Sequence, residues 1–98
     1  MIIKKKDLEF NNGKTKVLVT GISGWIAQFC AVELIKNGYI VRGSLRSNNR
    51  ENEVRNAIDS VIDSTNALEF CHLDLTNHDG WDEAMKDITY VLHVASPF

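Results

Sequence analysis

The most constraining feature of this 98-residue sequence is a threefold alternation between short apolar runs and helical segments. The apolar runs are rich in β-branched residues, a pattern typical of strands buried on both faces of a parallel sheet. We expect strands over residues 16–20, 39–45, 67–72 and 89–95. Because parallel strands are joined by right-handed crossovers, the series predicts an open α/β sheet with strand order 3-2-1-4 and helices on both faces.

Local signals place the three expected helices. The first runs over 25–37, with Gly38 at the C′ position where a left-handed residue is common. The second runs over 51–62, supported by an i,i+4 pair of Glu51 and Arg55. Its apolar face comprises Val54, Ala57, Ile58, Val61 and Ile62. The third has Thr76 as its predicted N-cap, with Asp79 three residues on. Its predicted core residues are Trp81, Ala84, Met85 and Ile88.

Length and charge exclude several classes of protein. A chain of 98 residues forms one domain, which we expect over 16–98 after a polar N-terminal arm of residues 1–15. A net charge of −2 and a pI of about 5.8 argue against a nucleic-acid-binding protein. No apolar run approaches the ~18 residues of a membrane span, and no signal peptide is evident. We therefore expect a cytoplasmic protein with no membrane partner.

The cysteine and histidine residues suggest no redox or metal chemistry. Cys30 and Cys71 are far apart in the sequence, and we interpret them as reduced, buried thiols, with a disulfide as the alternative. His72, His78 and His93 lack the spacing of metal ligands, so we expect no metal site. We expect His93, within an apolar strand, to be a core histidine with one nitrogen hydrogen-bonded.

A glycine-rich turn, Thr20–Ala27, joins the first strand to the first helix. Gly21 would make the tight turn, Gly24 would allow close approach of a ligand, and Ala27 would keep the helix near the sheet. The helix N-terminus offers N–H groups and a partial positive charge to a pyrophosphate. In a βαβ unit this predicts dinucleotide binding by the N-terminal portion of a Rossmann-type doubly wound parallel sheet. The alternative is a tight turn that binds no ligand.

The end of the second strand indicates which dinucleotide is bound. A site for NAD places an acidic residue there, but no Asp or Glu occurs between Glu33 and Glu51. Arg46 stands beside the expected position and could pair with a 2′-phosphate, whereas a solvated loop cation is the alternative. Arg42 and Arg50 are further candidates nearby for contact with the 2′-phosphate. The sequence therefore favours NADP(H) over NAD(H).

Several segments resemble a known family. The turn Thr20–Ala27 resembles the TGxxGxxG/A signature of extended short-chain dehydrogenases/reductases, within the NAD-dependent epimerase/dehydratase superfamily. Similarity to the dihydroflavonol reductase-like branch, in particular to its aldehyde and ketone reductases, is carried by residues 41–47, 50–55, 74–75, 80–84 and 90–98. The resemblance runs from about Lys16 to the last residue. It implies an NADP(H)-dependent oxidoreductase that reduces an aldehyde or ketone by hydride transfer.

The resemblance also implies roles for single residues. The pyrophosphate would be lined by Ser23, Gly24, Trp25 and Ile26. Arg46 would contact the 2′-phosphate, and Asp74 would accept a hydrogen bond from the adenine amino group while Leu75 packs on the ring. Beside the nicotinamide-side ribose would lie Val94, Ala95 and Ser96. For Asp74 the alternative is a cap at the helix start before Thr76, and for Trp25 a surface-packed aromatic.

The chemistry of that family needs a Ser or Thr together with a Tyr-x-x-x-Lys pair. Four residues after Tyr39 is Gly43, and four after Tyr90 is Val94, so the pair is absent and we expect no catalytic residue in this chain. We interpret the chain as an incomplete cofactor-binding domain without turnover of its own. The alternatives are a non-catalytic dinucleotide-binding or interaction module, or one half of a reductase that a second chain completes. Self-association or a partner chain would then use the exposed fourth strand.

Overall fold

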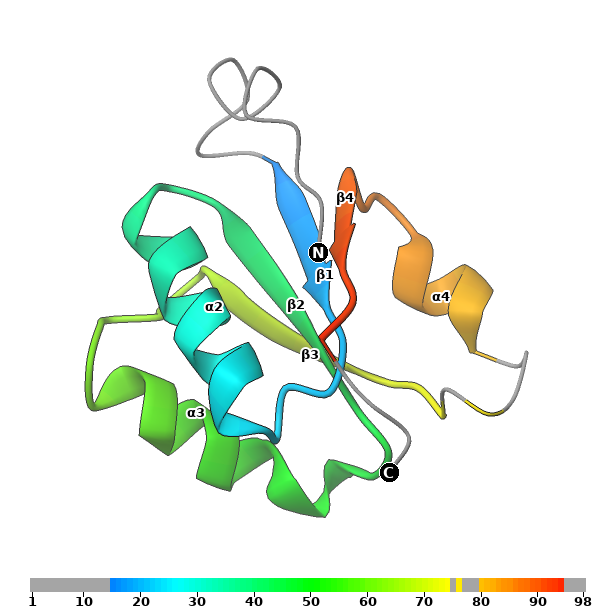
Figure 1. The fold of residues 1–98 in the computed structure, drawn as a ribbon, viewed down its shortest axis with the longest axis horizontal. Helices are drawn as coiled ribbons and strands as arrows, with labels where there is room; N and C mark the ends of the chain where they lie inside the picture. Colours follow the sequence, from blue (N-terminus) through cyan, green and yellow to red (C-terminus); the bar gives the residue numbers. More distant parts are fainter. Residues whose placement is uncertain (1–14, 75, 77–79, 95–98) are drawn as a thin grey trace.

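The four strands form one parallel sheet in the order β3-β2-β1-β4, as the sequence predicts (Figure 1). The computed structural model describes residues 15–74, 76 and 80–94. The elements are β1 (Lys16–Val19), α2 (Trp25–Lys36), β2 (Ile40–Leu45), the 3-10 turn η1 (Asn48–Arg50), α3 (Glu51–Asp59), β3 (Leu68–His72), α4 (Trp81–Met85) and β4 (Tyr90–Leu92). The predicted N-terminal arm, apart from Thr15, lies outside the described residues.

Helices cover both faces of the sheet, with α2 and α3 on one face and α4 on the other (Figure 1). Successive residues of β1 point to opposite faces, which divides the core in two. Val17 and Val19 belong to the larger cluster beneath α2 and α3. Leu18 belongs to a smaller cluster with Leu73 and Ala84 of the α4 side. The doubly wound α/β architecture is therefore confirmed.

The helix ends agree with the sequence in α2 and differ in α3. Gly38 follows α2 with a φ of 90°, as expected for a left-handed C′ residue. α3 ends at Asp59, before the end that the spacing of apolar residues predicts at residue 62. Val61 is 63% exposed and the prediction that it lies on the apolar face is wrong, although Ile62 still packs against the larger cluster.

The prediction that Thr76 caps the third helix is wrong. α4 has Gly80 as its N-cap, in the left-handed conformation with a φ of 93°. Thr76 instead donates its N–H and its hydroxyl to Asp74. Within α4, Trp81 packs against the smaller cluster, but Met85 is 39% exposed and so is not a core residue. Asp79 lies outside the described residues.

The predicted pair of Glu51 and Arg55 is also wrong, because both side chains find partners on β3. The Arg55 guanidinium donates to the Leu68 carbonyl at 3.3 Å and lies 5.1 Å from the centre of the Phe70 ring. The Glu51 carboxylate is 3.2 Å from Nε2 of His72. Tertiary contacts therefore replace the local pair.

β4 is shorter than expected and lies at the edge of the described sheet, where it pairs with β1 alone. His93 follows it and is exposed, so the prediction of a core histidine is wrong, although Nδ1 does lie 3.1 Å from the Thr20 hydroxyl oxygen. Self-association or partner binding through this strand stays a prediction. Among the described residues, no helix is both long and apolar enough to cross a lipid bilayer.

The two cysteines are free thiols, which excludes the alternative of a disulfide between them. Both are half-buried rather than fully buried. Cys30 packs against the larger cluster and Cys71 against the smaller one, so the sheet separates them. Burial raises the pKa of the Cys71 thiol.

Candidate functional site

The segments that the sequence assigns to a cofactor all follow the carboxyl ends of parallel strands. Leu45 of β2 is in register with His72 of β3, and Val19 of β1 with Leu92 of β4. After these residues the strands end on the same side of the sheet, at their carboxyl ends, beside the N-terminus of α2 (Figure 1). Open α/β sheets bind ligands at the carboxyl ends of their strands.

The glycine turn after β1 is held in place by backbone and side-chain hydrogen bonds. Gly21 has a φ of 67°, a conformation that favours glycine, as predicted for the tight turn. Its N–H donates to the Ser44 hydroxyl oxygen at 3.0 Å, and the Ile22 N–H donates to the Ser44 carbonyl at 3.0 Å. The Gly24 N–H closes the turn on the Gly21 carbonyl at 3.0 Å.

The N-terminus of α2 is open to an anion. The first N–H groups of a helix have no acceptor within it, and no described side chain caps them here. The first turn of α2 also contains no acidic residue, which leaves the partial positive charge of the helix N-terminus uncompensated. Trp25 is 78% exposed and Ile26 is exposed too, whereas Ala27 is 1% exposed against the sheet, as its predicted packing role requires.

Nothing in the described part of the chain requires a glycine at position 24. Its φ of −81° suits any residue, and an added Cβ would lie 3.5 Å from the Gly21 carbonyl oxygen, an ordinary contact. Ser23 is half-buried, and its carbonyl accepts a hydrogen bond from the Gln28 side chain at 3.2 Å. Gly24 itself is exposed, so its backbone is accessible to a ligand.

The arginines near the end of β2 differ in how they are engaged. Arg46 is exposed, and within the described residues no ion pair or hydrogen bond engages its guanidinium. Arg50 donates to both carboxylate oxygens of Glu53, at 2.9 and 3.3 Å. That hydrogen bond raises the pKa of Arg50 and lowers the pKa of Glu53.

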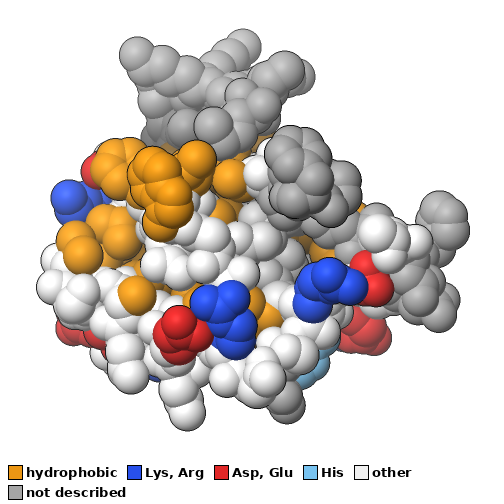
Figure 2. Space-filling view, turned by 60° about the horizontal axis from the view of Figure 1, so that its bottom comes forward, with side chains coloured by type: hydrophobic (Ala, Val, Ile, Leu, Met, Phe, Trp, Pro, Cys, Tyr) orange, Lys and Arg blue, Asp and Glu red, His pale blue; other side chains and the backbone are white. Residues whose placement is uncertain are grey.

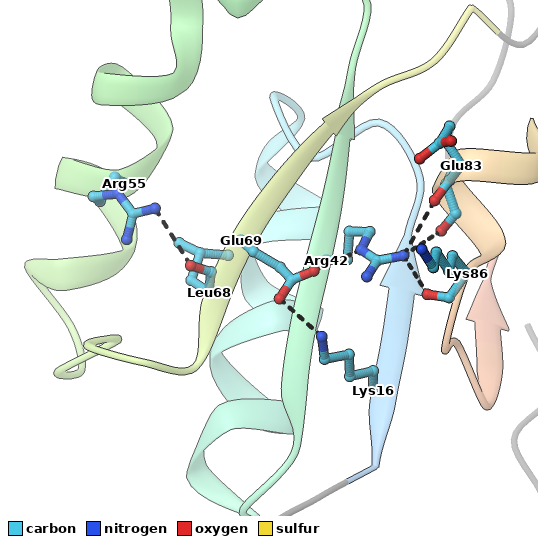
Figure 3. Close-up of polar contacts among 8 residues, drawn as sticks. Lys16, Arg42, Arg55, Leu68, Glu69, Glu83 and Lys86 are labelled. Atoms are coloured by element: carbon cyan, nitrogen blue, oxygen red, sulfur yellow. Dashed lines mark hydrogen bonds and ion pairs between the residues drawn. The ribbon is translucent and has the colours of Figure 1, made fainter. Parts of the chain in front are cut away.

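Arg42 is a structural residue and not a reserve for a ligand. It lies in the middle of β2 and is 9% exposed. Its Nε donates to Glu69 at 2.7 Å, and Nη1 donates to the carbonyls of Ala84 and Lys86 at 2.8 and 2.7 Å (Figure 3). Lys16 reaches the second oxygen of Glu69 at 3.3 Å. The guanidinium thus joins β2, β3 and the end of α4.

Asp74 follows β3 and lies close enough to Arg46 for the arginine's charge to act on it. Its Oδ1 accepts the Thr76 hydroxyl at 2.7 Å and the Thr76 N–H at 2.9 Å. These bonds, and then the charge of Arg46, lower the pKa of the carboxyl group. The alternative role as a helix cap is wrong, because α4 begins only at Trp81. Leu75 lies outside the described residues.

A hydroxyl group links β1 to the segment after β4. Thr20 is fully buried, and its hydroxyl oxygen accepts the Val94 N–H at 3.0 Å. The same oxygen lies 3.1 Å from Nδ1 of His93. Val94 is therefore fixed beside the glycine turn, whereas Ala95 and Ser96 lie outside the described residues.

Comparison with known proteins identifies the family. The model of the NAD dependent epimerase/dehydratase family matches residues 17–97. The chain belongs to that family. It is similar to the dihydroflavonol 4-reductase of Callistephus chinensis, at 35% identity over 81 residues that make up 83% of this chain and 22% of the relative. It is also similar to the bifunctional dihydroflavonol 4-reductase/flavanone 4-reductase of Pyrus communis, at 33% identity over 83% of this chain and 23% of the relative.

A solved structure in the comparison extends the likeness to the fold. The crystal structure of vestitone reductase from alfalfa (Medicago sativa) superposes with a TM-score of 0.71 at 28% identity. That match covers 87% of this chain and 26% of the alfalfa protein. The chain thus spans about a quarter of the length of the relatives it matches.

Two features of this family member are not predicted from the sequence: the role of Ser44 and the exposure of Phe29 beside Trp25 and Ile26. Ser44 lies within the segment 41–47 that resembles the family, but the sequence predicts no role for it, because only the strand register brings it to the glycine turn. The exposed hydrophobic side chains of α2 are Trp25, Ile26 and Phe29. Figure 2, which brings the lower end of Figure 1 forward, shows hydrophobic side chains gathered beside scattered Lys and Arg side chains. In the sequence, apolar residues lie around the whole circumference of α2, and this pattern is a signal for the second feature alone.

Proposed function

We propose that this chain binds NADP(H) and is the cofactor-binding portion of a reductase that acts on an aldehyde or ketone. The observation that carries the proposal is the glycine at position 24. Neither its backbone conformation nor its neighbours require a glycine, so the close approach of a ligand explains the residue. The uncapped N–H groups of α2 beside it suit the negative charge of a pyrophosphate.

The preference for the phosphorylated cofactor rests on Arg46. This guanidinium is exposed beyond the end of β2 and engaged by no described acceptor, so it is available to a 2′-phosphate. Arg50 would need to exchange Glu53 for the phosphate, which makes it the weaker candidate. Asp74 is ionised at neutral pH, and no described residue donates to its second oxygen, which would accept a hydrogen bond from the adenine amino group.

The bound nicotinamide would supply the hydride that reduces a carbonyl carbon. The residues of this chain would bind the pyrophosphate, select the 2′-phosphate and orient the cofactor along the edge of the sheet. The sequence contains no Tyr-x-x-x-Lys pair, so the proton for the carbonyl oxygen would come from residues outside these 98. We propose that the part of a reductase absent from this chain supplies them, in the same polypeptide or in a second one.

The proposal is tested by measuring dissociation constants for NADPH and NADH with the wild type and with Arg46→Gln. We expect the wild type to bind NADPH more tightly than NADH. Removing a charge-assisted pair should weaken NADPH binding about tenfold and leave NADH binding unchanged.

Lys36→Gln is the matched control, because it removes an exposed cation at the opposite end of α2. It should change neither constant. Equal affinities of the wild type for the two cofactors would contradict the assignment of NADP(H), and binding of neither would contradict the proposed function altogether.

A further inference from the structure

Ser44 contacts the glycine turn through both of its oxygen atoms. The side-chain oxygen accepts the Gly21 N–H at 3.0 Å, and the carbonyl oxygen accepts the Ile22 N–H at 3.0 Å. Ser44 is 2% exposed, so both of its oxygen atoms lie within the protein. Two consecutive N–H groups of the turn are therefore fixed by one residue of the neighbouring strand.

The residue before Ser44 fixes the same turn by packing. A Cβ atom on Gly43 would lie 2.7 Å from Cβ and Cγ1 of Ile22 and 2.9 Å from its Cγ2. Ile22 is fully buried in the larger cluster and has no room to move away. β2 thus holds the turn by close contact at Gly43 and by hydrogen bonds at Ser44.

The hydroxyl bond matters because Gly21 has a positive φ. Without the Ser44 hydroxyl, the N–H of the half-buried Gly21 would have no acceptor on β2, and rotation of the peptide would be the simplest way to satisfy it. Such a rotation would move Gly21–Gly24, which leads directly into the first N–H groups of α2.

We propose that Ser44 is a positioning residue for cofactor binding, which aims the glycine turn at the pyrophosphate through its hydrogen bond to Gly21. The inference rests on the proposed function and deepens it. Because NADH and NADPH share the pyrophosphate, loss of this bond weakens the binding of both cofactors by the same factor. Arg46, two residues further along the chain, affects NADPH alone.

The test compares Ser44→Ala with Ser44→Thr, which keeps the hydroxyl group. For each full-length variant, dissociation constants for NADPH and NADH are measured, together with the melting temperature and the amide resonance of Gly21. Ser64→Ala is the matched control, because Ser64 is a fully buried serine whose hydroxyl bonds to Asp59, away from the turn.

We expect Ser44→Ala to raise the dissociation constants of both cofactors about fivefold, the effect of one lost hydrogen bond. It should also shift the Gly21 amide resonance. Ser44→Thr should restore the affinities and the resonance. Ser64→Ala should lower the melting temperature without changing either affinity.

Three results would overturn the proposal. The first is wild-type affinity in Ser44→Ala, which would leave the proposed function intact. The second is a selective loss of NADPH binding, which would assign Ser44 to the 2′-phosphate. The third is a failure of the wild type to bind either cofactor, which would refute the proposed function itself and this inference with it.

Discussion

Arg42 and Arg46 lie four residues apart on the same stretch of chain and have opposite environments. Arg42, in the middle of β2, is 9% exposed and donates to Glu69 and to the carbonyls at the end of α4. Arg46, just beyond the end of β2, is exposed and engaged by none of the described acceptors. The same residue type therefore stabilises the fold at one position and is available to a ligand at the other.

Position relative to the strand end decides the role of a charged residue in a parallel sheet. The middle of β2 is covered on both faces, so a charge there must find partners in the protein. At the carboxyl end the covering elements diverge, and a charge can face solvent or ligand. Changes in the middle of β2 should then affect stability, and changes at its end should affect binding.

The largest effect is expected from Arg42→Met, which keeps an apolar stem and removes the charge. It leaves Glu69 and the carbonyls of Ala84 and Lys86 without their donor. We expect a loss of about 3 kcal/mol in the free energy of unfolding, moderated by the partial exposure of Glu69. Denaturant unfolding measures it.

Arg55→Met provides the matched control, because that arginine makes a longer bond of 3.3 Å to one carbonyl. Its loss of stability should be smaller. If Arg42→Met changed the ratio of NADPH to NADH affinity while leaving stability intact, the division between the middle and the end of β2 would be refuted.

Gly43→Ala tests the junction between the two regions. The added Cβ would overlap Ile22 at 2.7 Å, so the turn or the strand must shift. We expect a loss of about 1–3 kcal/mol in the free energy of unfolding and, because Ile22 belongs to the glycine turn, weaker binding of both cofactors. Unfolding curves and cofactor titrations on the same samples measure the two effects.

Gly24→Ala is the control for stability, since its Cβ would make an ordinary contact at 3.5 Å and its φ of −81° suits alanine. It should leave the free energy of unfolding within about 0.5 kcal/mol of the wild type. A Gly43→Ala protein as stable as Gly24→Ala would mean that β2 does not support the turn by close packing.

The topology could be predicted from the sequence because local periodicity and crossover handedness determine it. Four β-branched runs and a glycine turn were enough to place β1 between β2 and β4. The start of α4 could not be predicted, because side chains competed for the same groups. Thr76 has the spacing of an N-cap, but Asp74 binds its hydroxyl and its N–H first.

The candidate site was predictable only in part, and for a related reason. Gly21 and Ala27 carry their signal in their type and position, and the structure places them as expected. Ser44 reaches the turn across 23 residues of sequence, and Arg42 reaches the end of α4 across more than 40. No local spacing shows such contacts, since they exist only once the strands are in register.

The smallest effect concerns acid stability in the middle of β2. Burial of the Glu69 carboxyl group alone would raise its pKa, but hydrogen bonds from Arg42 and Lys16, with their charges, outweigh burial and lower it below the ordinary value of 4.5. The unfolded chain therefore binds this proton more readily than the folded protein. The contribution of Glu69 to stability is complete above pH 4.5 and is lost as the pH falls through the folded pKa.

We expect Glu69→Gln to reduce the loss of wild-type stability on acidification below pH 4.5, measured as the free energy of unfolding against pH. Glu53→Gln is the matched control, because its pKa is also lowered, but by Arg50 at the exposed start of α3, where water screens the pair. A larger change in Glu53→Gln than in Glu69→Gln would show that burial in mid-strand adds nothing to the pair. In the Arg42→Met background the effect of Glu69→Gln should shrink, because Lys16 alone then holds the carboxylate.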